Sequence, residues 1–179
     1  PYNKNKLDTE NFTFLNKYEE KLKNKLVSKG KPLKELDYKI YRGIKTGFND
    51  AFVINSSIRE NILKESPKSK YFLKPILRGR DIGQYKYNFN KLWMITIPSG
   101  WTNKQCKPFD AERFMNKNYS AILNHLEKID KGRKKLNKSN RRAKGLKQRE
   151  DQGDYWWELR DCDYYELYKE NKIIWIELS

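Results

Sequence analysis

The chain has 179 residues, of which 37% are hydrophobic and 14% aromatic, and this is enough to build one domain with a small appendage. The aromatic content argues against a fully disordered chain, and the absence of a long apolar run excludes a membrane-spanning helix. The 39 Lys and Arg residues against 23 Asp and Glu residues give a formal net charge of +16, which favours a polyanionic partner.

The first predicted element is an amphipathic helix over residues 9–28, with Thr9 as its cap and Gly30 and Pro32 after its end. Its predicted apolar face is formed by Phe14, Leu15, Tyr18, Leu22 and Leu26. The chain starts without Met and without a signal-peptide stretch, so we expect it to be part of a longer polypeptide.

The next predicted elements form a hairpin. Alternation over residues 38–44 favours a strand, residues 45–50 are typical of a turn, and residues 51–54 favour a second strand. A short helix is expected to follow, capped by Ser56 or Ser57.

Residues 92–97 are the clearest buried strand, and a long helix is predicted after Asn118. The apolar face of that helix is formed by Tyr119, Ile122, Leu123, Leu126 and Ile129. His125 lies beside this face and is expected to pack rather than to bind a ligand.

The tail predicts a short helix over residues 163–168 and a strand over residues 172–176, close to where the sequence stops. The sheet is therefore expected to continue in sequence that is not present. Together the elements predict an α+β fold, a small mixed sheet with flanking helices.

The positive charge is concentrated in residues 128–149, which contain 11 basic residues and one acidic residue. This clustering favours a contact surface for phosphates, although a solvated loop would show the same pattern. The predicted contacts are Lys138, Arg141, Arg142, Lys144, Lys147 and Arg149.

Two glycine-containing segments are further candidates. In residues 43–49, two glycines four apart predict a tight turn that presents Lys45, Thr46 and Asn49 to a phosphate or a base edge, unless it is an ordinary hairpin turn. In residues 74–82, Arg78 and Arg80 flank a glycine. Arginine forks suit phosphates and guanine, although Asp81 next to them would equally fasten a turn.

The segment 155–160 contains two adjacent tryptophans, of which one is expected in the core and the other, Trp156, is a candidate for stacking on a base or sugar, unless both are buried in the core. Catalytic patterns are missing. There is no Asn/Asp-Pro-Pro-Tyr/Phe tetrad, no glycine-rich turn for a methyl donor, and no catalytic set that a single histidine would complete. The sequence therefore predicts a binding domain without a catalytic centre, a cofactor or a metal.

The segments 40–54, 73–82, 156–160 and 172–177 occur in an order that resembles a known family. It is the TaqI-like C-terminal specificity domain of adenine-specific DNA methyltransferases and of Type IIG restriction–modification enzymes. The resemblance spans about residues 36–179, and residues 1–35 would correspond to the helical connector that follows the catalytic domain.

The resemblance implies that this domain reads double-stranded DNA while a separate domain of the same cytoplasmic polypeptide binds S-adenosylmethionine and methylates adenine. Some members also cleave DNA, for which magnesium is expected in the parent enzyme. Only the framework of residues 43–49 and 78–81 is carried over, because each member reads a different site.

Two other functions stay open at this point. A basic RNA-binding module fits the charge, although no RNP-type or GXXG signature is present. A small nuclease would need Asp110, Glu112 or Glu150, which lack the spacing of a convincing metal site.

Overall fold

The computed structural model describes residues 15–32, 35–136 and 145–175, with side chains omitted for residues 132–136. The chain divides into two compact units, Pro1–Arg42 and Gly43–Ser179. Each unit is described separately below.

The first unit contains helix α1 (Lys17–Lys29). Asn16 begins it with a capping box: its side chain accepts hydrogen bonds from the backbone N–H groups of Tyr18 and Glu19, and the Glu19 carboxylate accepts one from the Asn16 N–H. The helix ends before Gly30, as predicted, but its first turn starts later than expected. The predicted cap Thr9 lies outside the described residues.

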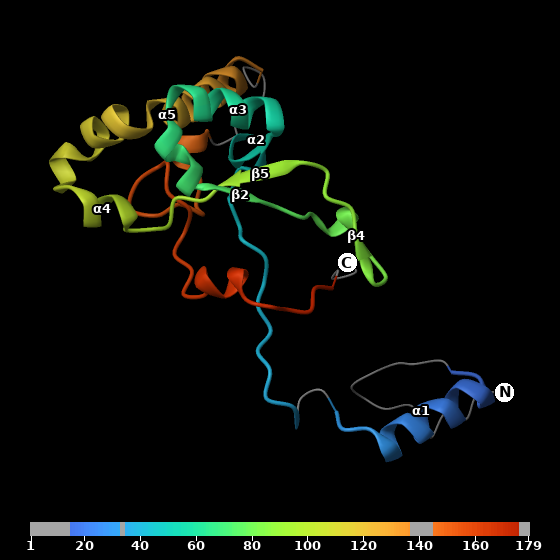
Figure 1. The fold of residues 1–179 in the computed structure, drawn as a ribbon. Coiled ribbons are helices and arrows are strands. Elements are labelled where there is room, and N and C mark those ends of the chain that lie inside the picture. Colours follow the sequence, from blue (N-terminus) through green and yellow to red (C-terminus); the bar gives the residue numbers. More distant parts are fainter. Residues whose placement is uncertain (1–14, 33–34, 137–144, 176–179) are drawn as a thin grey trace. The chain divides into compact units, whose positions relative to one another are not determined.

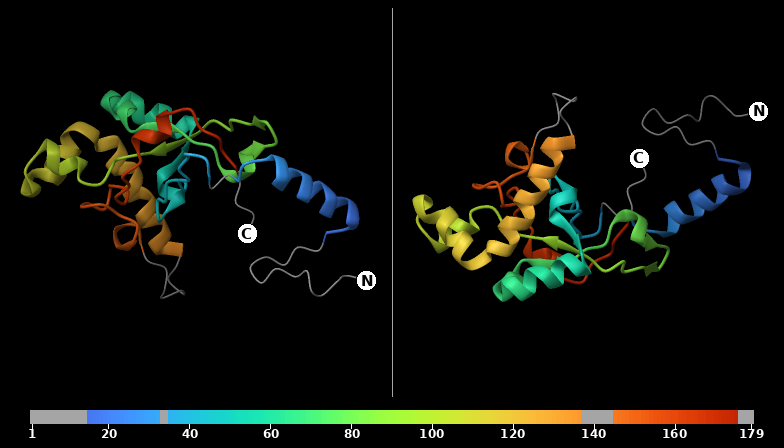
Figure 2. Two further views of the ribbon diagram at one scale, coloured as in Figure 1. Left: turned by 90° about the horizontal axis from the view of Figure 1, so that it is seen from below. Right: turned by 90° about the horizontal axis from the view of Figure 1, so that it is seen from above.

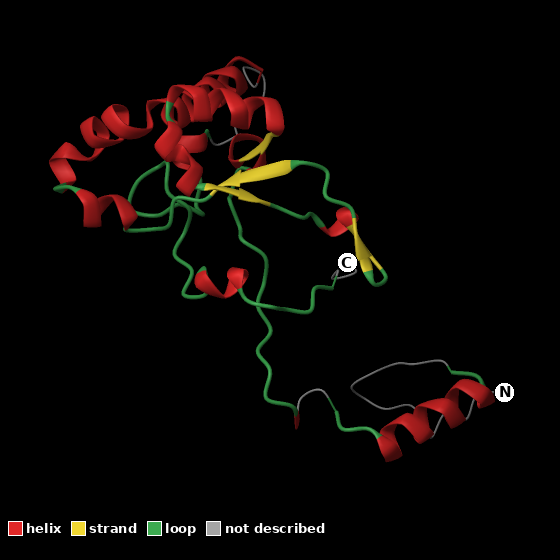
Figure 3. Cartoon of the chain, in the orientation of Figure 1, coloured by secondary structure: helices red, strands yellow, loops and turns green. Residues whose placement is uncertain are grey.

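The second unit is built on a three-stranded antiparallel sheet of β1 (Val53–Asn55), β5 (Leu92–Ile95) and β2 (Leu73–Pro75), with β5 in the centre (Figures 1 and 3). Val53 is paired with Met94, and Leu73 with Ile95. The sheet lies beneath helices, which confirms the α+β class. The predicted central strand is confirmed over residues 92–95.

The hairpin predicted over residues 38–54 is wrong. Residues 38–44 form no strand, and the predicted second strand begins instead as a helical turn, α2 (Asn49–Phe52). The Thr46 hydroxyl accepts a hydrogen bond from the Phe48 N–H, at 3.1 Å, and so bends the chain just before α2. Both Ala51 and Phe52 can then enter the core, because they lie on a helical turn rather than on opposite faces of a strand.

Helices cover the sheet. They are α3 (Ser56–Glu65), which Asn55 rather than Ser56 caps, and α5 (Ala111–Leu136). The short helix α4 (Trp101–Gln105) lies to one side of the sheet and contacts α5 (Figure 1). The long helix α5 is kinked at Tyr119, whose φ and ψ are −139° and 32°. It was predicted to begin only after Asn118, and the kink marks that same place.

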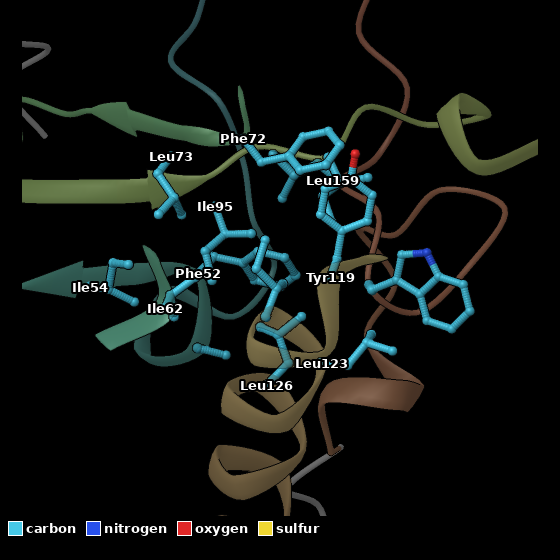
Figure 4. Close-up of a cluster of buried hydrophobic side chains, with 14 of the residues drawn as sticks. Phe52, Ile54, Ile62, Phe72, Leu73, Ile95, Tyr119, Leu123, Leu126 and Leu159 are labelled. Carbon is cyan, nitrogen blue, oxygen red and sulfur yellow. The ribbon is translucent and has the colours of Figure 1, made fainter. Parts of the chain in front are cut away.

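The hydrophobic core lies between the sheet and α5 (Figure 4). The predicted apolar face of α5 is confirmed, since Tyr119, Ile122, Leu123 and Leu126 are buried. His125 packs as expected: its Nε2 lies 3.0 Å from the carbonyl oxygen of Ala51, and burial lowers its pKa.

Short 3-10 turns connect these elements: η3 (Pro67–Tyr71), η4 (Gly79–Asp81), η5 (Pro108–Asp110), η6 (Leu146–Gln148) and η7 (Glu166–Lys169). The predicted tail helix is present only as η7. The predicted tail strand is wrong over residues 172–175, which are exposed and unpaired with any strand in the described part of the chain.

Two short strands were not predicted. β3 (Ile82–Gly83) and β4 (Lys86–Tyr87) form a two-stranded antiparallel ribbon in which Gly83 pairs with Lys86. The two views of Figure 2, with Figure 1, show this ribbon projecting from the second unit, away from the C-terminal end of α5.

Candidate nucleic-acid interface

The concentration of positive charge begins on the last turns of α5. Lys128 and Lys131 are exposed there, and Lys147 is exposed on η6, near the other end of the same segment. Four predicted contacts, Lys138, Arg141, Arg142 and Lys144, lie outside the described residues.

Asp130, the single acidic residue of the segment 128–149, is buried. Its Oδ1 accepts a hydrogen bond from the backbone N–H of Leu146, at 2.7 Å, and Leu146 itself is fully buried in the core. The two ends of the segment are therefore joined through the core. The only acidic side chain in the segment is therefore turned away from solvent.

Lys147 lies over the ring of Trp156, with its Nζ 4.4 Å from the ring centroid. The same ammonium lies 3.4 Å from a carboxylate oxygen of Glu127, which also pairs with Lys131. Trp156 is half-buried, and one of its faces is thus already covered by a cation. Its neighbour Trp157 is buried and donates from its indole Nε1 to the Thr102 hydroxyl, at 3.0 Å. Trp157 therefore lies in the core, and Trp156 packs against the core while it is only partly buried.

Arg149 was predicted to contact DNA, and the structure contradicts this role. The residue is only 5% exposed, and its guanidinium lies 4.6 Å from the centroid of the Phe52 ring. It donates to four backbone carbonyls, those of Leu146, Asp151, Trp156 and Glu158. Burial lowers its pKa to about 10. The guanidinium uses four of its five N–H donors to hold the tail against the core.

Thr46 was also predicted to contact DNA, and its burial contradicts this role. It is buried, and its hydroxyl donates to the Asn49 Oδ1 at 2.6 Å while accepting from the Phe48 N–H. The hydroxyl is thus used to shape the turn. Lys45 and Asn49 remain exposed on it.

The turn of residues 43–49 packs directly against the segment that contains Arg149. Gly47 has a φ of +65°, and a Cβ atom added there would lie 2.9 Å from Asp151 Cβ and 3.2 Å from Arg149 Cδ. Glycine is required for both reasons. The structure therefore packs the turn that contains Lys45 and Asn49 against Arg149 and Asp151, although the sequence separates them by about a hundred residues.

We expect Gly47→Ala to lower the free energy of unfolding by about 2–3 kcal/mol. The added methyl group would clash with side-chain atoms of Asp151 and Arg149, and alanine would have to adopt the left-handed backbone conformation. Urea unfolding measures the change. Gly43→Ala is the matched control: no atom lies within 4 Å of its added Cβ. Its effect should stay within about 0.5 kcal/mol. Equal effects of the two substitutions would show that the close approach at Gly47 is not important.

The segment of Arg78 and Arg80 lies apart from this group, at the base of the β3–β4 ribbon. Arg78 is tied to Asp81, whose carboxylate accepts from the Arg78 N–H at 2.8 Å, from its Nε at 3.0 Å and from its Nη2 at 3.0 Å. These bonds hold the pKa of Asp81 well below its usual range. Arg78 therefore fastens a turn, the alternative that the sequence left open, and Arg80 is the exposed arginine of the pair.

The predicted contacts thus form two groups rather than one continuous surface. The first contains Lys45, Asn49, Lys147 and Trp156 and adjoins the end of the basic segment. The second contains Arg80 and lies on the projecting ribbon. No protein-family model matches the chain, and no curated protein matches its sequence.

The described residues contain no cluster of three or more His, Cys, Asp or Glu side chains that could hold a metal ion. Of the carboxylates considered for a nuclease, Glu112 and Glu150 are exposed and Asp110 is half-buried. In the described part of the chain, every helix is too short or too polar to cross a bilayer.

Proposed function

We propose that this chain recognises double-stranded DNA by sequence, as the specificity domain of an adenine-specific DNA methyltransferase or of a Type IIG restriction–modification enzyme. The observation that carries the proposal is the basic segment 128–149: it holds 11 basic residues, its one acidic side chain is buried, and its ends are fixed to the core by Asp130 and Leu146. Such a segment binds a dense line of phosphates and repels acidic surfaces.

The resemblance of the segments 40–54 and 73–82 to specificity domains supports DNA rather than another polyanion. In this proposal the contacts to phosphates give affinity and register, and a few side chains that reach base edges give sequence preference. S-adenosylmethionine, and magnesium where the parent enzyme cleaves DNA, would act in other domains of the polypeptide.

The test is a fluorescence-anisotropy titration of the chain with duplex DNA over a range of salt concentrations. If about six phosphates are neutralised, log K falls with log salt at a slope of about −5. Arg141→Ala combined with Arg142→Ala should weaken binding to all duplex sequences alike and flatten the slope by about 2. The matched control, Lys21→Ala with Lys25→Ala on α1, removes the same charge from another unit and should leave the slope nearly unchanged.

Two outcomes would contradict the proposal. Absence of binding to any duplex at low salt would exclude a DNA-binding domain that acts by itself. Tighter binding to structured RNA than to duplex DNA at matched salt would favour the RNA-binding alternative.

A further inference from the structure

The β3–β4 ribbon has features that the basic segment does not explain. Residues 80–91, here called the basic ribbon, run out along β3, turn through Gln84 and Tyr85, and return along β4. The ribbon projects from the body of the second unit in each view (Figures 1 and 2). Its tip is therefore open to a large ligand.

Tyr85, at this tip, has a backbone conformation that is unfavourable for a residue with a side chain. Its φ is +58°, in the left-handed region where glycine or asparagine is preferred, and the residue is 99% exposed. The ring gains no packing within the described structure that would offset the strained backbone. Tyr87 and Phe89 are exposed on the same ribbon, so the aromatic character is not confined to one position. Strain held at an exposed site points to a function outside the fold.

The charge of the ribbon is of one sign. The sequence has no Asp or Glu between Asp81 and Asp110, but it has four lysines there. Arg80, Lys86 and Lys91 are exposed on the ribbon, whereas the carboxylate of Asp81 is buried and paired with Arg78. Aromatic rings between cations are complementary to nucleic acid, whose bases present flat apolar faces and whose backbone is anionic.

The base of the ribbon is rigid, because Asp81 ties its two strands together. Its carboxylate accepts from the Asn90 Nδ2 at 2.8 Å as well as from Arg78, and its carbonyl accepts from the Asn88 N–H at 2.7 Å. Beyond Asn90, the carbonyl of Lys91 accepts from the Ser56 hydroxyl at 3.3 Å, which fastens the second strand to α3. A ribbon that is already ordered loses little conformational entropy on binding.

We propose that the basic ribbon enters the major groove of the DNA duplex, with Arg80, Lys86 and Lys91 on the phosphates and the Tyr85 ring in contact with the bases. The major groove is wide enough for a two-stranded ribbon. This inference rests on the proposed function and assigns the base-contacting part to an element that lies apart from the basic segment. The basic segment then supplies affinity, and the ribbon supplies sequence preference.

The experiment compares binding of the 179-residue chain to a duplex selected by it from a random library and to a scrambled duplex of the same length. Tyr85→Gly should weaken binding to the selected duplex about tenfold and binding to the scrambled duplex less than about twofold, with the salt slope unchanged, since the ring contacts no phosphate. The variant should fold at least as stably as the wild type, because glycine relieves the left-handed strain. Tyr85→Phe keeps the ring and should retain the preference.

Lys86→Ala should instead weaken binding to both duplexes equally and flatten the salt slope by about 1. Phe109→Ala is the matched control: Phe109 is also an exposed aromatic residue, with Lys107 Nζ 5.9 Å from its ring centroid, but it lies on η5. The Phe109→Ala variant should bind both duplexes as the wild type does. If Tyr85→Gly also binds as the wild type does while Arg141→Ala with Arg142→Ala weakens binding, the ribbon proposal is wrong and the proposed function stands. If the wild type binds no duplex, both are wrong.

Discussion

Arg149→Ala is expected to lower the free energy of unfolding by about 3–4 kcal/mol, the largest effect of any charged residue in the basic segment. The substitution removes a side-chain donor from four carbonyl groups, of which those of Leu146 and Glu158 keep a backbone N–H donor, and it opens a cavity beside the Phe52 ring. Arg149→Lys keeps the charge, but one ammonium cannot reach carbonyls that a planar fork spans. We expect it to cost about 2–3 kcal/mol, measured by urea unfolding monitored by circular dichroism.

Lys147→Ala is the matched control, two residues away and exposed. Removing its contacts with Glu127 and Trp156 should change stability by less than about 1 kcal/mol. If Arg149→Ala were as mild as Lys147→Ala, the buried guanidinium would not hold the tail, and Arg149 would have to be restored to the predicted DNA contacts.

Glu158→Gln is expected to lower the free energy of unfolding by about 2–4 kcal/mol. The Glu158 side chain is fully buried, and its carboxylate accepts from three backbone N–H groups, those of Gly100 at 3.0 Å, Thr102 at 2.9 Å and Asp154 at 3.0 Å. Glutamine has one acceptor oxygen in place of two, so its amide nitrogen would face N–H groups that it cannot satisfy.

The same unfolding measurement on Glu112→Gln provides the comparison, since Glu112 is an exposed glutamate on α5. Its effect should stay within about 0.5 kcal/mol. A neutral result for Glu158→Gln would mean that the three N–H groups find other acceptors and that the carboxylate does not join the tail to α4.

The elements that were predicted correctly from the sequence are those whose pattern of hydrophobic residues results from their burial against the core. The face of α5 that contains Ile122 and Leu126 repeats because that side of the helix covers the sheet, and β5 is an unbroken apolar run because it is the central strand. The prediction failed at residues 38–44, where alternation alone suggested a strand. A strand also needs a partner, and residues 38–44 have none within the described structure.

The candidate site was harder to predict, because the sequence does not show which charged side chains are buried and which are exposed. Arg149 and Lys147 are two residues apart in the same basic run, yet one is buried and the other exposed. The neighbouring residues contained a signal: Arg149 is the last cation before the acidic and aromatic tail, and Glu158 lies between Trp157 and Leu159, which are both buried. A charged residue between two core residues is a candidate for hydrogen bonds within the protein rather than for contact with a ligand.

The basic ribbon was missed for a different reason. Its two strands have only two residues each, too few for alternation to be visible. Two features of the sequence pointed to it: Gly83 before the turn, and a long interval without any acidic residue after Asp81. Only the structure shows that Tyr85 is exposed at the tip, because its left-handed backbone is set by the turn and not by the residue type.

The hydrogen bond between Asp130 and Leu146 has a consequence for how such a protein diversifies. Because the core joins the two ends of the intervening segment, insertions and deletions within it should change the entropy of closing the chain only slowly, by about 0.6 kcal/mol for each doubling of its length. Related proteins can therefore exchange the intervening cations, or graft a longer stretch in their place, and keep the same folded body. We therefore expect the folded body to tolerate substitutions between Asp130 and Leu146 more readily than substitutions of these two anchors.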